Sequence, residues 1–211
     1  MKQEIKEKLL HIAKRCYNEG LLTGISGNVS VFDRESGVMA ITPTSLPYDE
    51  MLVDDIVCIT LDGQSVSGKH KPSSEWPMHA VIYKENPGIS AIIHTHSAYA
   101  TSFAINNMSI PVILIEMVPV LGGDIKLAEF AMPGTQELGL KAVEALKDKY
   151  ACLLANHGVL AIGESLDKAY IRATCLEDIA KTYSFSLNNG AVSIIPDEVV
   201  QIMKRRDGQG L

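Results

Sequence analysis

Residues 89–96 read Ile-Ser-Ala-Ile-Ile-His-Thr-His, a short apolar run that ends on two histidines. A bounded apolar run of this length predicts a buried strand. Ahead of it, Ser73-Ser74-Glu75 begins a predicted helix with a serine cap, an early carboxylate and a proline in the first turn, and Pro87-Gly88 ends this helix. After it, Ser97 caps a second predicted helix over 97–106. The strand therefore connects two helices.

N-terminal to this strand and its flanking helices, residues 24–62 consist of short alternating apolar runs separated by turn pairs such as Gly27-Asn28 and Asp62-Gly63. This pattern is typical of strands joined by tight turns, and it predicts antiparallel pairing. Because strands and helices do not alternate regularly along the chain, we expect a mixed, largely antiparallel sheet with helices on its faces. The remaining expected elements are helices over 4–19, 134–149 and 165–190, and strands over 110–120, 151–155 and 159–162.

Composition places the chain among ordinary globular proteins. Its 211 residues, 46% hydrophobic and 21% charged, fit one domain spanning 1–211. A net charge of −6 argues against a sequence-independent nucleic-acid binder, and no apolar stretch is long enough to cross a membrane. The four cysteines form no CxxC pair and the charged first residues lack the apolar core of a signal peptide, so a cytoplasmic location is expected. Residues 204–211 are polar, and we expect them to be frayed.

Three histidines occupy positions that suit a metal ion. His94 and His96 are two residues apart at the end of a predicted strand, where period-two geometry puts both side chains on one face. His157 lies in an Asn-His-Gly turn, where a loop presents a side chain from a rigid base. Three imidazoles with an open position are typical of a catalytic zinc site. The alternative is that they are ordinary surface or core histidines. We interpret the others, His11, His70 and His79, as residues on helix or loop surfaces.

Glu75 is the candidate carboxylate. In one interpretation it is a fourth metal ligand, or a general base whose pKa is tuned by a nearby cation. In the other it is only an acid that complements the dipole at a helix N-terminus.

Two clusters suit an anion. Gly27-Asn28 offers backbone amides and an amide side chain, while Ser73-Ser74 offers hydroxyls and free amides at a helix start, and Thr44-Ser45 adds further hydroxyls. Each has a plain alternative as a turn, a cap or a strand exit. The sequence contains no Walker loop, GxGxxG fingerprint or GxSxG elbow.

Five motifs in order carry a family resemblance. They are Gly27-Asn28-Val29-Ser30, Ile41-Thr42-Pro43-Thr44, Pro72-Ser73-Ser74-Glu75, His94-Thr95-His96 and Asn156-His157-Gly158. With these motifs the sequence resembles the class II aldolase/adducin family from the first helix to about Asn189, and within it most resembles the aldolases of L-fuculose 1-phosphate. The resemblance implies a three-layer α/β/α fold and a homotetramer with active sites at subunit interfaces.

The same resemblance implies the roles of the motif residues. It implies one Zn²⁺ per subunit, bound by His94, His96 and His157, with Glu75 alternating between metal contact and proton transfer. The residues implied to bind the substrate phosphate are Gly27, Asn28, Thr44, Ser45, Ser73 and Ser74.

The implied reaction is reversible cleavage of a ketose 1-phosphate, L-fuculose 1-phosphate or a similar deoxy-ketose 1-phosphate. Its products are dihydroxyacetone phosphate and a short aldehyde such as lactaldehyde. Zinc stabilises the enediolate in this chemistry, so no Schiff-base lysine is required.

The sequence departs from the family pattern in three places. Ser45 stands where the family's aldolases often have a glycine, and a proton-donating tyrosine is replaced around Ile115-Glu116. A second tyrosine, near the C-terminus of those aldolases, has no counterpart in residues 204–211. We hypothesise that Glu116 replaces the missing tyrosine as proton shuttle. Its alternative is a charged residue that ends an apolar strand.

The same resemblance leaves three other interpretations of the function open. Glu116-Met117 before Gly122-Gly123 is similar to the segment of methylthioribulose-1-phosphate dehydratases in which the matching glutamate is the acid/base. A pentulose-5-phosphate 4-epimerase shares the frame and retro-aldol chemistry. A non-catalytic module like the adducin head shares the fold and lacks the metal ligands, which this sequence retains.

Overall fold

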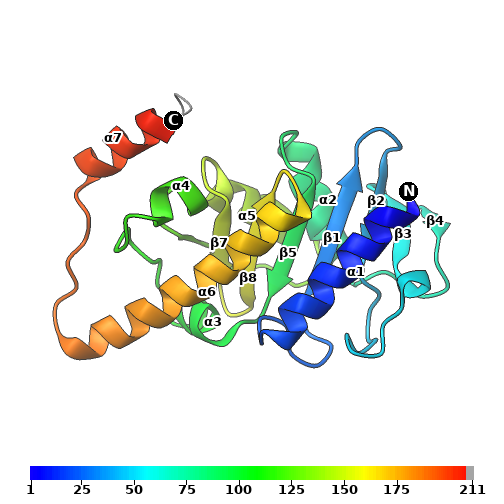
Figure 1. The fold of residues 1–211 in the computed structure, drawn as a ribbon, viewed down its shortest axis with the longest axis horizontal. Helices are drawn as coiled ribbons and strands as arrows, with labels where there is room; N and C mark the ends of the chain where they lie inside the picture. Colours follow the sequence, from blue (N-terminus) through cyan, green and yellow to red (C-terminus); the bar gives the residue numbers. More distant parts are fainter. Residues whose placement is uncertain (208–211) are drawn as a thin grey trace.

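The structure, a computed structural model, describes residues 1–207 and has an eight-stranded sheet with helices on both faces (Figure 1). The sheet order is β4-β3-β2-β1-β5-β8-β7-β6. Its strands are β1 (Asn28–Asp33), β2 (Val38–Ile41), β3 (Val57–Thr60), β4 (Ser65–Ser67), β5 (Ala91–Thr95), β6 (Lys126–Ala128), β7 (Ala151–Leu154) and β8 (Gly158–Gly163). The pair β6–β7 is parallel and the other pairs are antiparallel. The predicted mixed, largely antiparallel sheet is confirmed.

The helices form the outer layers of the predicted α/β/α sandwich. They are α1 (Gln3–Asn18), α2 (Trp76–Glu85), α3 (Ala98–Ile105), α4 (Met117–Leu121), α5 (Gln136–Leu146), α6 (Leu166–Asn189) and α7 (Asp197–Asp207), with the 3₁₀ turn η1 (Val53–Asp55). In Figure 1, α1 and α6 cross in front of the sheet, and α2 and α5 lie behind it. No helix among residues 1–207 is long and apolar enough to cross a membrane.

Alternating side chains of the central strands build a separate core on each face. Ile93 and Ala161 pack with the buried residues of α1 and α6. Their neighbours Ile92 and Leu160 pack with α2 and α5. Because side chains alternate between faces, His94 projects on the same face as Ile92, toward α2. A third cluster joins α3, α4 and α6 to β7 and β8.

Two predicted segments differ from the structure. The strand expected over 110–120 is absent, because Ile110 makes only an isolated bridge to Ile125, and residues 117–121 form α4. Pro111 follows that bridge, and a proline cannot donate a ladder hydrogen bond. Residues 204–207, expected to be frayed, belong to α7, which contacts α4. Residues 208–211 lie outside the described part of the chain.

Candidate functional site

Four of the predicted residues converge at one point. Each of Glu75, His94, His96 and His157 offers one ligand atom, and these atoms lie within 4.8 Å of one another. His94 Nε2 lies 3.0 Å from Glu75 Oε2, and His157 Nε2 lies 3.2 Å from Glu75 Oε1. The Nε2 atoms of His94 and His96 are 3.0 Å apart. Side chains of the type that binds a borderline cation therefore meet in one small volume.

Three different elements place these side chains. His94 is the fourth residue of β5, and His96 follows two residues later, as the period-two expectation required. His157 lies in the turn that joins β7 to β8, after Asn156 in the left-handed conformation with φ 54°. Glu75 is the N-cap residue of α2. The serine cap predicted for this helix is replaced by a turn in which Ser73 Oγ accepts from the Glu75 amide.

A hydrogen bond to the backbone fixes the orientation of the His94 ring. Its Nδ1–H donates to the Val159 carbonyl at 2.9 Å, so Nε2 points into the cluster. A histidine that donates its outer ring nitrogen to a backbone carbonyl is the usual arrangement around a metal.

The cluster fits a divalent cation by the chemistry of its donors. Glu75 Oε1 is buried and makes no hydrogen bond within residues 1–207, although it lies 3.2 Å from His157 Nε2. A buried polar atom without a partner lowers the stability of the fold by roughly 1 to 3 kcal/mol, so such atoms normally have a hydrogen-bond or metal partner. Three imidazoles and one carboxylate match the ligand types of zinc and related metals.

The ionisation of the cluster also suits a cation. Burial raises the pKa of the Glu75 carboxyl, but the charge and hydrogen bond of His94 outweigh this effect and hold that pKa well below its ordinary value. Burial, together with the charge of His94, lowers the pKa of His157 to about 4 and lowers the pKa of His96. At neutral pH the carboxylate is charged and these two imidazoles are neutral.

Two glycines allow the strands to approach the cluster. A Cβ on Gly158 would lie 2.5 Å from the Thr95 carbonyl oxygen and 2.8 Å from His96 Cδ2. A Cβ on Gly27, whose φ is 77°, would lie 2.6 Å from the His94 carbonyl oxygen. Both positions therefore require glycine.

The three segments predicted to bind phosphate lie side by side. The amide of Ser73 donates to the Thr42 carbonyl, and the amide of Thr44 donates to the Lys71 carbonyl. Thr42 in turn exchanges hydrogen bonds with Val29 of β1. The residues predicted to bind phosphate differ in burial: Thr44, Ser45 and Ser74 are exposed, Gly27 is half-buried, and Asn28 and Ser73 are buried. The structure thus brings the three segments together at one end of the sheet, and Asn28 and Ser73 contact Glu75 directly.

Across residues 7–184 the chain matches the sequence profile of the Class II Aldolase and Adducin N-terminal domain. It belongs to the class II aldolase and adducin family. The 5-deoxy-D-ribulose 1-phosphate aldolase of Bacillus thuringiensis serovar kurstaki is 34% identical over 209 residues, which cover 99% of this chain and 98% of that protein. The L-fuculose phosphate aldolase of Escherichia coli (strain K12) is 37% identical over 185 residues, 87% of this chain and 85% of that protein.

A solved structure agrees with these matches. An L-fuculose 1-phosphate aldolase superposes with a TM-score of 0.93 and 38% identity, covering 98% of this chain and 97% of that one. The predicted family, the three-layer fold and the predicted enzyme class, a class II aldolase, are confirmed.

Glu116 lies apart from the four-residue cluster of this aldolase-family chain. It is exposed and immediately precedes α4. Burial raises the pKa of the Cys175 thiol to about 11, and the charge of Glu116 contributes to this rise, so Glu116 lies near α6. The structure therefore does not bring Glu116 together with the other predicted site residues.

Sequence reasoning missed His79, which it interpreted as a surface residue. The side chain is fully buried on α2, with Nδ1 2.7 Å from Ser30 Oγ, and burial lowers its pKa to about 3. The signal was available, because His79 lies four residues after Glu75 and therefore on the same side of the helix. A second missed contact joins Asn28 Nδ2 to Glu75 Oε2 at 3.0 Å.

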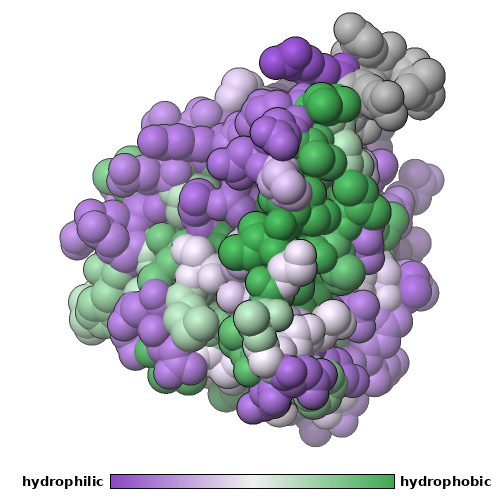
Figure 2. All heavy atoms as spheres, turned by 90° about the vertical axis from the view of Figure 1, so that its left-hand side faces the viewer, coloured by the Kyte–Doolittle hydropathy of each residue, from purple (hydrophilic) through white to green (hydrophobic). Residues whose placement is uncertain are grey.

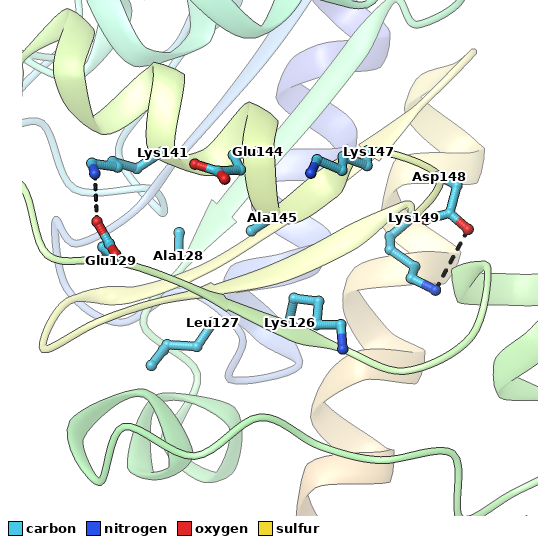
Figure 3. Close-up of a pocket in the computed structure, with 10 residues that line it drawn as sticks. All are labelled: Lys126, Leu127, Ala128, Glu129, Lys141, Glu144, Ala145, Lys147, Asp148 and Lys149. Carbon is cyan, nitrogen blue, oxygen red and sulfur yellow. Dashed lines mark hydrogen bonds and ion pairs between the residues drawn. The ribbon is translucent and has the colours of Figure 1, made fainter. Parts of the chain in front are cut away.

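A pocket of about 350 Å³ between β6 and α5 contains none of the predicted site residues (Figure 3). Its walls carry Lys126, Lys141 and Lys149, but Glu129 binds Lys141, and Asp124 binds both of the others. Each of these three lysines is therefore paired with a carboxylate. The predicted metal ligands cluster around Glu75 instead.

Proposed function

We propose that this chain is a divalent-metal-dependent aldolase that cleaves a ketose 1-phosphate to dihydroxyacetone phosphate and a short aldehyde. The observation that carries this proposal is the convergence of Glu75 and the three histidines within 4.8 Å. Family membership supports it, because relatives over most of the chain are named as sugar-phosphate aldolases.

The histidines His94, His96 and His157, together with Glu75, would hold the cation, and we propose zinc. When bound, the metal supplies positive charge that stabilises negative charge developing on the substrate's oxygens. The hydroxyls and amides of the gathered segments would bind the phosphate, which keeps the reacting carbons beside Glu75. Thr44, Ser45 and Ser74 support this assignment because their hydroxyls are open to solvent.

The chain's own residues would carry the protons. Cleavage breaks the bond between C3 and C4 and leaves its electron pair on the dihydroxyacetone phosphate fragment. Glu75 would take up a proton from solvent and deliver it to C3 of that fragment, since its carboxylate lies at the cluster. A second group must remove the proton from the C4 hydroxyl as the aldehyde forms. We propose Glu116 for this step.

Glu116 is outside the cluster of its own chain, so this assignment requires a second copy to bring it there. Figure 2 shows apolar side chains gathered on the side of the molecule that carries α7 and the segment before it. Exposed apolar residues of these elements and their neighbours include Ile115, Phe185 and Ile194. Apolar surface of this kind is typical of a subunit interface. We propose the homotetramer with active sites between subunits on this basis.

The substrate we propose is a deoxy-ketose 1-phosphate. The relatives named above are aldolases of 5-deoxy-D-ribulose 1-phosphate and of L-fuculose phosphate, which differ in the aldehyde half. Both compounds should be tested on the zinc-loaded protein, with dihydroxyacetone phosphate release followed through coupled NADH oxidation. Release that stops with a chelator supports the proposal, and no release from either compound contradicts it.

A dehydratase is the second candidate, and the carboxylate at position 116 favours it. Glu116→Gln should cut turnover steeply without loss of metal. The matched control is Glu137→Gln, another exposed carboxylate near a helix start. Turnover of Glu116→Gln at the level of the control would refute the catalytic role. Water loss from methylthioribulose 1-phosphate without aldol cleavage would identify the dehydratase.

A further inference from the structure

A line of buried polar side chains joins β1 to α2. Asn28 contacts Glu75, and Ser30 Oγ lies 2.7 Å from both His79 Nδ1 and Tyr83 Oη. The strand residues are two apart and the helix residues are four apart, so each set lies on one face of its element. We call this set the β1–α2 polar contact. Its five residues are all buried, and they are Asn28, Ser30, Glu75, His79 and Tyr83. The position of α2 along β1 is therefore sensitive to these bonds.

Asn28 occupies the end of this contact that lies in the site. It is 2% exposed and pairs across the sheet with His94 as its direct Cα partner. Its Nδ2 donates to Glu75 Oε2 at 3.0 Å, and His94 Nε2 lies 3.0 Å from the same oxygen. One carboxylate oxygen is therefore held between two neighbouring side chains of the sheet, while the other faces His157.

This arrangement limits what Asn28 can do for a phosphate. The bond to Glu75 requires the amide nitrogen to face the carboxylate, which fixes the orientation of the amide. Asn28 Oδ1 is buried without a hydrogen-bond partner among the described residues. The amide nitrogen keeps one further N–H, which is the one proton of this side chain left for a phosphate oxygen. The strongest contact that the side chain makes is the one to Glu75, because its partner is charged.

We propose that Asn28 is a positioning residue for Glu75, which holds the carboxylate against His94 and His157 and so sets the affinity of the cluster for a divalent cation. The inference rests on the proposed function and assigns to this side chain a second task besides phosphate binding. Without the amide, Glu75 loses its charged hydrogen bond and gains rotational freedom. The metal then has to order the carboxylate when it binds, which weakens binding.

The test is a Co²⁺ titration of the metal-free full chain, followed by visible absorption. Asn28→Leu keeps the approximate shape of the side chain and removes the donor, and Asn28→Ala serves as a second variant if the first does not fold. We expect cobalt to bind about 10- to 100-fold more weakly, as for other groups that support a metal ligand.

Two comparisons separate positioning from phosphate binding and from a loss of structure. Ser74→Ala, which removes a hydroxyl from the phosphate segment, should leave cobalt affinity unchanged, in contrast to Asn28→Leu. Ser30→Ala removes the other end of the β1–α2 polar contact, and should lower the melting temperature while cobalt affinity is kept. In a Glu75→Ala background, Asn28→Leu should add no further loss of cobalt affinity, because the residue acts through Glu75.

Several outcomes would overturn the inference. They are an unchanged cobalt affinity in Asn28→Leu, an equal loss in Ser30→Ala, or a full additional loss in the Glu75→Ala background. Cobalt binding and aldol cleavage by the unaltered protein report on the proposed function, whereas differences among the variants report on Asn28. A protein that bound cobalt normally and cleaved neither sugar phosphate would refute the function alone.

Discussion

Asp55 fixes the segment that leads into the serines beside Glu75. Its buried carboxylate accepts from Lys69 Nζ at 2.8 Å and from the Leu52 amide at 2.7 Å, and lies 2.9 Å from His70 Nε2. The hydrogen bond from Lys69, followed by that from Leu52, holds the pKa of the Asp55 carboxyl at about 2, against an ordinary value of 3.8. Replacing the charge with Asp55→Asn should therefore destabilise the fold in a pH-dependent way.

The size of the effect follows from the pKa shift. The fall in the Asp55 pKa from 3.8 to about 2 corresponds to about 2.5 kcal/mol, since a tenfold change in an equilibrium constant is worth roughly 1.4 kcal/mol. Because Lys69 is 60% exposed, solvent screens the pair, and we expect about 1 kcal/mol. The folded pKa is depressed, so this stability is present above about pH 4 and is lost as the pH falls toward about 2.

Urea unfolding of the wild type and Asp55→Asn at a series of pH values measures this difference. At pH 7 the free energy of unfolding should fall by about 1 kcal/mol in the variant, and the difference should shrink between about pH 4 and pH 2. A difference that stays constant over this range would refute the reasoning, because it would show that the charge is not what stabilises the contact.

Three further predictions concern the site. Gly158→Ala should destabilise the fold by about 1 to 3 kcal/mol and weaken Co²⁺ binding, because the new Cβ meets the Thr95 carbonyl and the His96 ring; unchanged thermal unfolding would contradict the packing described. Ser45 has a φ of 59°, so Ser45→Val should cost about 1 to 3 kcal/mol in urea unfolding while Ser45→Gly should not; equal losses in both would mean that the hydroxyl, and not the backbone, matters there. Zinc at 100 times its dissociation constant should add about 2.7 kcal/mol, or roughly 5 to 10 °C in melting temperature, which a chelator reverses; a melting temperature indifferent to zinc would argue against the metal site.

The central part of the fold could be predicted because local patterns determine it. The apolar run over 89–94 and the turn around His157 mark strands without knowledge of the rest of the chain. The two-residue spacing of His94 and His96 is enough to put both on one face. The convergence of these histidines with Glu75 is confirmed, whereas the predicted metal and phosphate roles remain proposals.

Other features depend on contacts that local patterns do not encode. The apolar run over 110–115 has the composition of a strand, but its first residue alone pairs with Ile125, and the chain then turns into α4. The burial of His79 requires knowing which face of α2 meets the sheet. The bond between Asn28 and Glu75 requires the register in which Asn28 faces His94. Helix α7 was not predicted, because most of its residues are polar. Its few apolar residues, such as Val200, pack against the third cluster, which joins α3, α4 and α6 to the sheet.

The most direct test of the account is dihydroxyacetone phosphate release from 5-deoxy-D-ribulose 1-phosphate and from L-fuculose 1-phosphate. It should be measured with the zinc-loaded protein, its chelated form, and a His96→Ala variant in parallel. We expect release from at least one compound, its loss on chelation, its return when zinc is restored, and no release by the variant. Release that persists after chelation, or in His96→Ala at the rate of the wild type, would contradict a metal-dependent aldolase.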